Sequence, residues 1–300
     1  WTPAHHRFER LALTLELLPH RLDLLHSPDF IPPLGGFFKS VITVHDLAFL
    51  KYPDILDASS HRTYTDQIKA AIARADAIIS VSQTTRTDLI EILNPPSDKI
   101  HVIYEAAGED MAAASASEVE RVKAAFNLPA GYVLFMGTYE PRKNIGGLLN
   151  AYRLLRASLP DAPPLALVGQ RGWLYADSLT LIRTLGLGEH VRLIENAADP
   201  DLAALYTGAS MLMLPSFYEG FGLPVLEAQT CGTPVIASDR GTLPEVAGKA
   251  TLLINPDDVF SIASAMERIL TDPALAKRLR DDGIANAARF SWMQAASQTL

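Results

Sequence analysis

Short apolar runs alternate with longer amphipathic segments along most of this sequence. Such an alternation is typical of strand–helix units that wind around a parallel sheet, so we expect an α/β fold. In the first part of the chain the pattern predicts helices over residues 60–75 and 84–93, and strands over residues 21–26, 40–44, 77–81 and 100–104.

The alternation breaks near residues 105–108, is followed by a small-residue stretch at 111–117, and then begins again. We interpret the break as a domain boundary or linker. The second series predicts a doubly wound sheet of at least five strands, at residues 132–136, 165–168, 191–194, 211–214, 234–238 and 251–254. Helices are expected at residues 147–157, 176–187, 259–270 and 273–288. The expected divisions are therefore residues 1–107, residues 108–288 and a terminal segment at 289–300.

Composition excludes several classes of protein. The 300-residue chain has a formal net charge of −8 at pH 7 and neither half is basic, which argues against a nucleic-acid partner. Its single cysteine, Cys231, excludes an intramolecular disulfide framework and a cysteine-based zinc cluster, and suits a reducing compartment. No apolar run approaches the ~18 residues of a membrane span, and no signal peptide is recognised. We therefore expect a cytoplasmic protein.

A glycine-rich string separates two glutamates after the strand expected at 211–214. Residues 219–227 read Glu-Gly-Phe-Gly-Leu-Pro-Val-Leu-Glu. The two glycines and the proline prevent a regular helix before about residue 223. We expect Pro224 at the first position of the helix, where its missing N–H costs nothing. Glu219 is then expected in a loop and Glu227 in the first turn of that helix.

The start of this helix predicts an anion site. Exposed main-chain amides of Phe221, Gly222 and Leu223 would point along the helix axis, at the positive end of its dipole. A carboxylate on each side would repel an anion, so Glu219 and Glu227 are expected to accept hydrogen bonds from sugar hydroxyls. A sugar, a diphosphate and a nucleoside fit this order. The alternative is that Glu227 only complements the helix dipole and the glycines only turn the chain.

A second candidate loop follows the strand expected at 132–136. Residues 137–144 read Gly-Thr-Tyr-Glu-Pro-Arg-Lys-Asn, with a helix expected just after them. The adjacent cations Arg142 and Lys143, at a strand end beside a helix start, can neutralise a diphosphate. A solvated Arg–Lys pair is the alternative on this pattern alone.

Together these strings resemble glycosyltransferase family 4 (group 1 glycosyl transferases), a family of retaining enzymes with the GT-B fold. The resemblance rests on the Glu219 and Glu227 string, on Gly-x-x-x-Pro-Arg-Lys-Asn, on Asp-Arg-Gly-Thr-Leu-Pro-Glu-Val at 239–246 and on Phe-Ser-Trp at 290–292. It implies two Rossmann-like lobes with a donor cleft between them, and a terminal helix at 289–300 that crosses back to the first lobe. Only about two dozen residues precede His26, so we expect the first lobe to be incomplete at its N-terminus.

The resemblance also implies roles for individual residues. Glu219 would contact the donor sugar, Glu227 would hold the nucleotide ribose, and Arg142 and Lys143 would stabilise the leaving diphosphate. His45, in a motif similar to Thr-x-His-Asp at the end of the strand over 40–44, would contact the donor sugar. The expected catalytic residues are Glu219, His45 and Lys143, and the expected donor-binding residues are Gly137, Arg142, Lys143, Phe221, Gly222, Leu223 and Glu227.

These roles imply retaining transfer of a hexosyl group from a nucleoside-diphosphate sugar, GDP-mannose or a UDP-sugar, to a hydroxyl of a glycan or lipid-linked acceptor. Arg142 and Lys143 take the place of a metal, so we expect no cofactor and no metal site. Peripheral association with the inner membrane face is compatible with this function. The alternatives are a GT-B nucleotide-sugar epimerase and a non-catalytic nucleotide-sugar-binding fragment. An NAD-dependent oxidoreductase is disfavoured, because no Gly-x-Gly-x-x-Gly follows an early strand.

Overall fold

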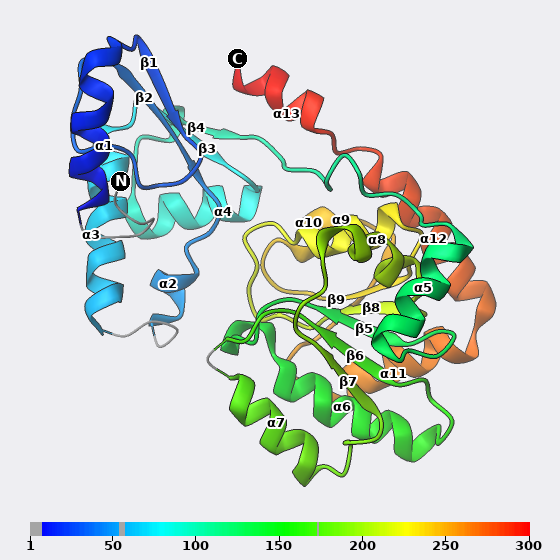
Figure 1. Cartoon of the computed structure of the whole chain (residues 1–300). Coiled ribbons are helices and arrows are strands. Elements are labelled where there is room, and N and C mark those ends of the chain that lie inside the picture. Colours follow the sequence, from blue (N-terminus) through cyan, green and yellow to red (C-terminus); the bar gives the residue numbers. More distant parts are fainter. Residues whose placement is uncertain (1–7, 54–57, 173) are drawn as a thin grey trace. The chain divides into compact units, whose positions relative to one another are not determined.

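A computed structural model of the chain describes residues 8–53, 58–172 and 174–300. By their internal contacts the residues form two compact units, Trp1–Tyr104 and Glu105–Gln298. Figure 1 shows that each unit has its own sheet with helices around it. The division after Tyr104 falls close to the break in the sequence pattern.

The first unit is built on a four-stranded parallel sheet with the order β1-β2-β3-β4. Its strands are β1 (Leu24–Ser27), β2 (Lys39–Val44), β3 (Ala77–Ser80) and β4 (Ile100–Val102). Its helices are α1 (Glu9–Leu17), α2 (Ala48–Lys51), α3 (Ala58–Arg74) and α4 (Gln83–Asp88), and a π-helical segment, Leu89–Leu93, extends α4. The buried side chains of Ile42, Val44, Ile68 and Ile78 join the sheet to α3 in one core.

Two local predictions for this unit are wrong. The first strand begins at Leu24 rather than at residue 21, because a 3-10 turn over Leu18–His20 ends with Arg21 in the left-handed conformation, at φ 49°. The helix expected over 84–93 is α-helical only to Asp88. Helix α1 was not predicted.

The second unit has a six-stranded parallel sheet, which confirms the prediction of at least five strands. Its strand order is β10-β9-β8-β5-β6-β7. In such a doubly wound sheet the chain adds strands first toward one edge and then toward the other. The reversal lies between β5 and β8. The strands are β5 (Val133–Met136), β6 (Leu165–Val168), β7 (Val191–Ile194), β8 (Met211–Leu214), β9 (Val235–Ser238) and β10 (Thr251–Ile254).

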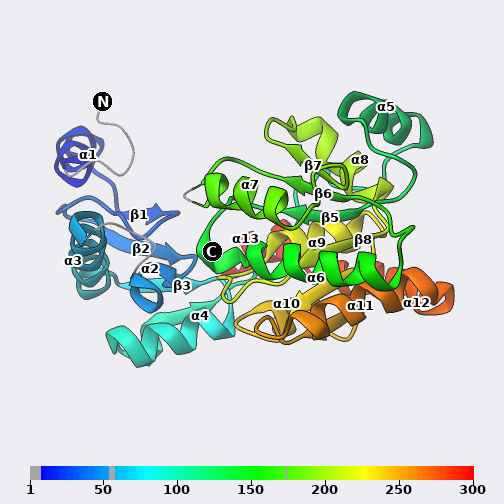
Figure 2. The ribbon, with the colours of Figure 1, turned by 90° about the horizontal axis from the view of Figure 1, so that it is seen from below.

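Alternate residues of these strands enter two separate cores, as expected for a sheet that is covered on both faces. Val133 and Phe135 point to a core with α6 (Ile145–Ser158) and α11 (Val259–Thr271), whereas Leu134 points to a core with α8 (Asp199–Gly208). Helix α6 lies in front of the sheet in Figure 2. The other helices are α5 (Ala116–Phe126), α7 (Tyr175–Thr184), α9 (Leu223–Thr230), α10 (Leu243–Ala247), α12 (Pro273–Ala287) and α13 (Trp292–Thr299).

The stretch at 111–117, expected to be a linker, ends inside helix α5, which begins at Ala116. The cause is a capping box: the Glu118 N–H donates to Ser115 Oγ, and the Ser115 N–H donates to the Glu118 carboxylate at 2.9 Å. Of the helices in the described ranges, none is both long enough and apolar enough to span a membrane.

Candidate functional site

The loops that follow β5 and β8 meet at the point where the strand order of the sheet reverses. Ligands of doubly wound sheets bind at such a point. The Phe217 N–H donates to the Arg142 carbonyl oxygen at 2.8 Å. Asn144 adds a second link, because its Nδ2 donates to the Pro215 carbonyl oxygen at 3.2 Å while its Oδ1 accepts from the Gly147 N–H at 3.1 Å and caps α6. These bonds hold the two loops against each other and against the start of α6.

Both loops contribute charged side chains to one buried group, which we call the Glu219 cluster (Glu140, Arg142, Lys143, Ser216 and Glu219). Lys143 Nζ lies 2.7 Å from Glu219 Oε1 and 2.9 Å from Oε2. Arg142 Nη1 lies 2.7 Å from Glu219 Oε2, and Ser216 Oγ donates to Oε1 at 2.6 Å. Glu219 is 5% exposed and Lys143 is 7% exposed. The structure thus brings together three residues that the sequence analysis selected.

The cluster holds its carboxylate ionised although it is buried. Burial alone would raise the pKa of Glu219, but the nearby charges of Lys143 and Arg142 outweigh it, and the pKa lies below its ordinary value. Glu140 accepts from Arg142 Nε at 2.8 Å, so two cations face two carboxylates.

Gly137, also expected to bind the donor, lies against the Lys143 side chain. A Cβ at Gly137 would stand 3.5 Å from Lys143 Cε. A Cβ at Gly169, the residue after β6, would stand 2.0 Å from the Gly137 carbonyl oxygen. The backbones that leave β5 and β6 therefore touch, and only glycine fits at residue 169.

The helix after the glycine-rich string begins at Leu223, as the sequence predicts to within a residue, but three details differ. Pro224 occupies the second helical position, and Glu227 lies beyond the first turn. Phe221 and Gly222 are buried rather than exposed, because the Phe221 ring packs against Phe290, with ring centroids 6.0 Å apart.

Gly222 caps this helix at φ 96°, a left-handed conformation that favours glycine. A Cβ there would stand 2.8 Å from Leu243 Cδ2, so both the backbone conformation and the packing select glycine. Leu223 is partly exposed at the helix start.

Glu227 has a neutral partner. The hydroxyl of Tyr206, in α8, donates to Glu227 Oε2 at 2.6 Å. Burial raises the pKa of Glu227, and this hydrogen bond offsets only part of the rise. Tyr206 is itself fully buried, and its carbonyl oxygen accepts from Thr233 Oγ1 at 2.6 Å. Tyr206 was not predicted as a site residue, because an aromatic residue in an apolar helix has the pattern of an ordinary core residue.

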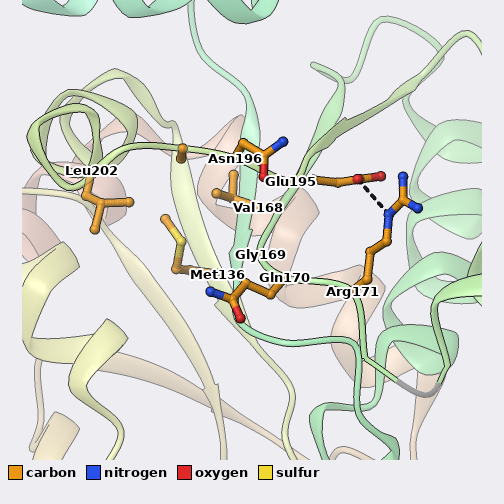
Figure 3. A pocket seen from close by; sticks show the side chains of 9 residues that line it. Met136, Val168, Gly169, Gln170, Arg171, Glu195, Asn196 and Leu202 are labelled. Carbon is orange, nitrogen blue, oxygen red and sulfur yellow. Dashed lines mark hydrogen bonds and ion pairs between the residues drawn. The ribbon is translucent and has the colours of Figure 1, made fainter.

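A pocket of about 640 Å³ lies at the carboxyl ends of β5, β6 and β7. Figure 3 shows its side chains, with the ion pair of Arg171 and Glu195 at one side. Leu202 of α8 lines the pocket and lies one helical turn before Tyr206, the hydrogen-bond partner of Glu227. The lining residues are Met136, Val168, Gly169, Gln170, Arg171, Glu195, Asn196, Ala197 and Leu202.

His45 lies in the first unit, whereas the other predicted site residues lie in the second. It follows β2, is exposed, and donates from Nε2 to the Pro28 carbonyl oxygen at 2.9 Å. His26, at the end of the neighbouring strand β1, is hydrogen-bonded through Nε2 to Thr43 Oγ1, also at 2.9 Å. Among the described residues, no group of three or more His, Cys, Asp or Glu side chains could hold a metal ion.

Comparisons with known proteins agree with this architecture. Residues 116–286, more than half of the chain, match the family described as Glycosyl transferases group 1, and residues 1–107 match Glycosyltransferase Family 4. The chain is 36% identical over 279 residues to O-antigen chain mannosyltransferase B of Escherichia coli, spanning 92% of this chain and 73% of that protein. It is also 36% identical over 285 residues to the serotype-specific mannosyltransferase WbdA of E. coli, but spans only 34% of that longer protein.

Solved structures match over nearly the whole chain. The sucrose-phosphate synthase of Thermosynechococcus elongatus superposes with a TM-score of 0.80 at 27% identity, covering 100% of this chain and 78% of that one. WaaG, a glycosyltransferase of lipopolysaccharide biosynthesis, has the same fold, with a TM-score of 0.81 at 16% identity and coverage of 99% and 84%. The prediction of the GT-B fold is confirmed.

Proposed function

Because the chain belongs to the family of group 1 glycosyl transferases, we propose that it transfers a hexosyl group from a nucleoside-diphosphate sugar to an acceptor hydroxyl with retention of configuration. The observation that carries the proposal is the Glu219 cluster, in which Arg142 and Lys143 converge on one carboxylate at the reversal point of the sheet. Two preorganised cations beside a helix start suit a leaving diphosphate.

The relatives support mannose as the transferred sugar and a growing glycan as the acceptor. Two of them are named as mannosyltransferases, one of which is named for the O-antigen chain. The donor in this proposal is GDP-mannose or a UDP-sugar, and the acceptor is a glycan or lipid-linked glycan in polysaccharide synthesis.

In the proposed reaction the bond between the anomeric carbon and the diphosphate oxygen breaks, and a bond from that carbon to the acceptor oxygen forms on the same face. The acceptor proton passes to the leaving diphosphate. Lys143 Nζ and Arg142 Nη1 would stabilise the negative charge on that diphosphate, which supplies electrostatically what a metal supplies in other enzymes. We therefore propose a metal-independent reaction.

The two glutamates would bind opposite ends of the donor. As the diphosphate takes over the donors of Arg142 and Lys143, the Glu219 carboxylate becomes available to the sugar hydroxyls, and His45 would contact the same sugar. Glu227 would accept from the ribose hydroxyls through Oε1, since Tyr206 already occupies Oε2. The base would then enter the pocket next to Tyr206 and Leu202, with the phosphates at Gly222 and Leu223.

Peripheral membrane association is the remaining part of the proposal. Phe8, Leu11, Leu15 and Leu18 are between 47% and 61% exposed, and they follow the spacing of one face of helix α1. An exposed apolar stripe of this kind can enter a bilayer interface. Cosedimentation with vesicles of anionic lipid should fall when Leu11 and Leu15 are both replaced by Ser, and unchanged cosedimentation would reject this part.

The transfer activity is tested with the whole chain and radiolabelled nucleoside-diphosphate sugars. We expect the free nucleoside diphosphate and a labelled product only when a glycan acceptor is present. An α-linked donor should give an α-linked product. Release of the nucleoside diphosphate without any acceptor product would favour a hydrolase, and conversion of the donor into an isomeric nucleoside-diphosphate sugar would favour an epimerase. Donor binding without turnover would favour a non-catalytic binding protein.

A further inference from the structure

The rim of the pocket at the carboxyl ends of β5, β6 and β7 carries an ion pair that the proposed transfer chemistry does not use. Arg171 Nε donates to Glu195 Oε2 at 2.7 Å, and the Tyr175 hydroxyl donates to Glu195 Oε1. The Arg171 guanidinium carbon also lies 4.8 Å from the centre of the Tyr175 ring. Both charged side chains are thereby held in place at the end of β7 and in the loop after β6.

The Arg171–Glu195 ion pair places two acceptor sites of the carboxylate next to a donor of the guanidinium. A carboxylate has about four lone-pair sites, so two sites of Glu195 remain after Arg171 and Tyr175 have donated. Hydrogen bonds from Tyr175 and Arg171 also lower the pKa of Glu195, so its side chain stays an acceptor at neutral pH. Arg171 is 66% exposed, and only its Nε is bonded to Glu195.

The bases differ in how they match such an edge. Guanine presents two adjacent donors, N1–H and the 2-amino group, next to the O6 acceptor. Uracil presents one donor between two acceptors, and the acceptors would face the carboxylate. The amides of Gln170 and Asn196, which also line the pocket, can pair with any base and do not discriminate.

We propose that Glu195 selects guanine in the donor, with its carboxylate accepting from N1–H and the 2-amino group and Arg171 donating to O6. This inference rests on the proposed function, since it assumes that a nucleoside diphosphate binds with its ribose at Glu227. It assigns the donor to the guanosine-diphosphate class. The volume of about 640 Å³ accommodates a purine.

Calorimetry on the whole chain tests the inference with GDP, inosine diphosphate and UDP. Inosine diphosphate differs from GDP only by the missing 2-amino group. We expect GDP to bind about 10-fold or more tightly than UDP, and inosine diphosphate to fall between them. Glu195→Gln keeps the shape of the side chain but turns one acceptor into a donor, and it should remove the preference for GDP over inosine diphosphate.

Glu189→Gln is the matched control, because Glu189 is exposed just before the opposite end of the same strand β7. It should leave all three affinities unchanged. Equal binding of GDP and inosine diphosphate by the unaltered chain, or tighter binding of UDP, would overturn the guanine assignment while leaving diphosphate binding intact. Failure of all three nucleotides to bind would reject the inference and the proposed function together.

Discussion

Glu219 and Glu227 belong to one short segment of chain, but their carboxylates have different partners and opposite pKa shifts. Glu219 accepts from two cations and a hydroxyl, and these partners lower its pKa although it is buried. Glu227 receives one neutral hydroxyl, from Tyr206, and its pKa rises. The loop holding Glu219 is bonded to the loop after β5, whereas Glu227 lies on a helix that packs against α8.

The spacing of two glutamates therefore does not define their chemistry. Two cations held in place by a carboxylate can receive an incoming anion, because the anion can replace the carboxylate as their partner. A carboxylate held by a neutral hydroxyl keeps its lone pairs for hydroxyl donors such as those of a ribose. The proposed division of the donor between the two regions follows from these partners.

Removal of Lys143 should produce the largest effect. Loss of one charge-assisted contact to a developing anion typically lowers kcat by ~10²–10³, and we expect Lys143→Ala to fall in that range. Steady-state transfer assays, with circular dichroism to verify folding, provide the measurement. Lys277→Ala is the control, since that side chain is 74% exposed. If the kcat of a folded Lys143→Ala variant fell by less than threefold, the Glu219 cluster would have no catalytic role.

Glu227→Ala tests the other region through binding. Hydrogen bonds to charged groups contribute about 1.5–3 kcal/mol, so the affinity for a bare nucleoside diphosphate should fall by roughly 10- to 150-fold. The affinity for inorganic diphosphate, which has no ribose, should not change. Calorimetry that finds equal nucleoside-diphosphate affinity in both proteins would contradict the ribose assignment.

Much of the fold can be predicted from sequence alone. So can those candidate site residues that stand in short, recognisable sequence motifs. Gly222, Glu219 and Lys143 stand in recognisable strings, and the strands at 165–168 and 191–194 coincide with β6 and β7. What it misses depends on distant partners. Ser216 and Tyr206 can be recognised as hydrogen-bond partners of Glu219 and Glu227 only in the folded structure. The capping box of Ser115 and Glu118 was readable but was hidden by a run of small residues.

The opposite pKa shifts predict opposite effects of pH on stability. Glu219 has a lowered pKa in the folded state, so its stabilisation is present above the ordinary carboxyl pKa and is lost as pH falls through the lowered value. Glu227 has a raised pKa, so its contribution is present below the ordinary value and is lost as pH rises through the raised one.

Melting temperatures of Glu219→Gln and Glu227→Gln, measured against the unaltered chain from acid to neutral pH, provide the test. Glu219→Gln should destabilise more at neutral pH than in acid. The penalty of Glu227→Gln should instead shrink as pH rises, because the variant no longer buries a charge. Parallel pH profiles for the two variants would mean that their environments are not opposed.

Tyr206→Phe should give the smallest effect and isolates one hydrogen bond of the Glu227 region. A typical hydrogen bond contributes about 0.5–1.5 kcal/mol, so nucleoside-diphosphate affinity should weaken by roughly 2- to 10-fold as Glu227 loses its fixed orientation. The kcat should stay within twofold, because the Glu219 cluster is untouched. Tyr152→Phe is the matched control: its hydroxyl is also buried and donates to the Pro163 carbonyl oxygen at 2.9 Å, so it should cost similar stability without changing affinity. Equal affinities for the two variants would show that Tyr206 serves only the packing of α8.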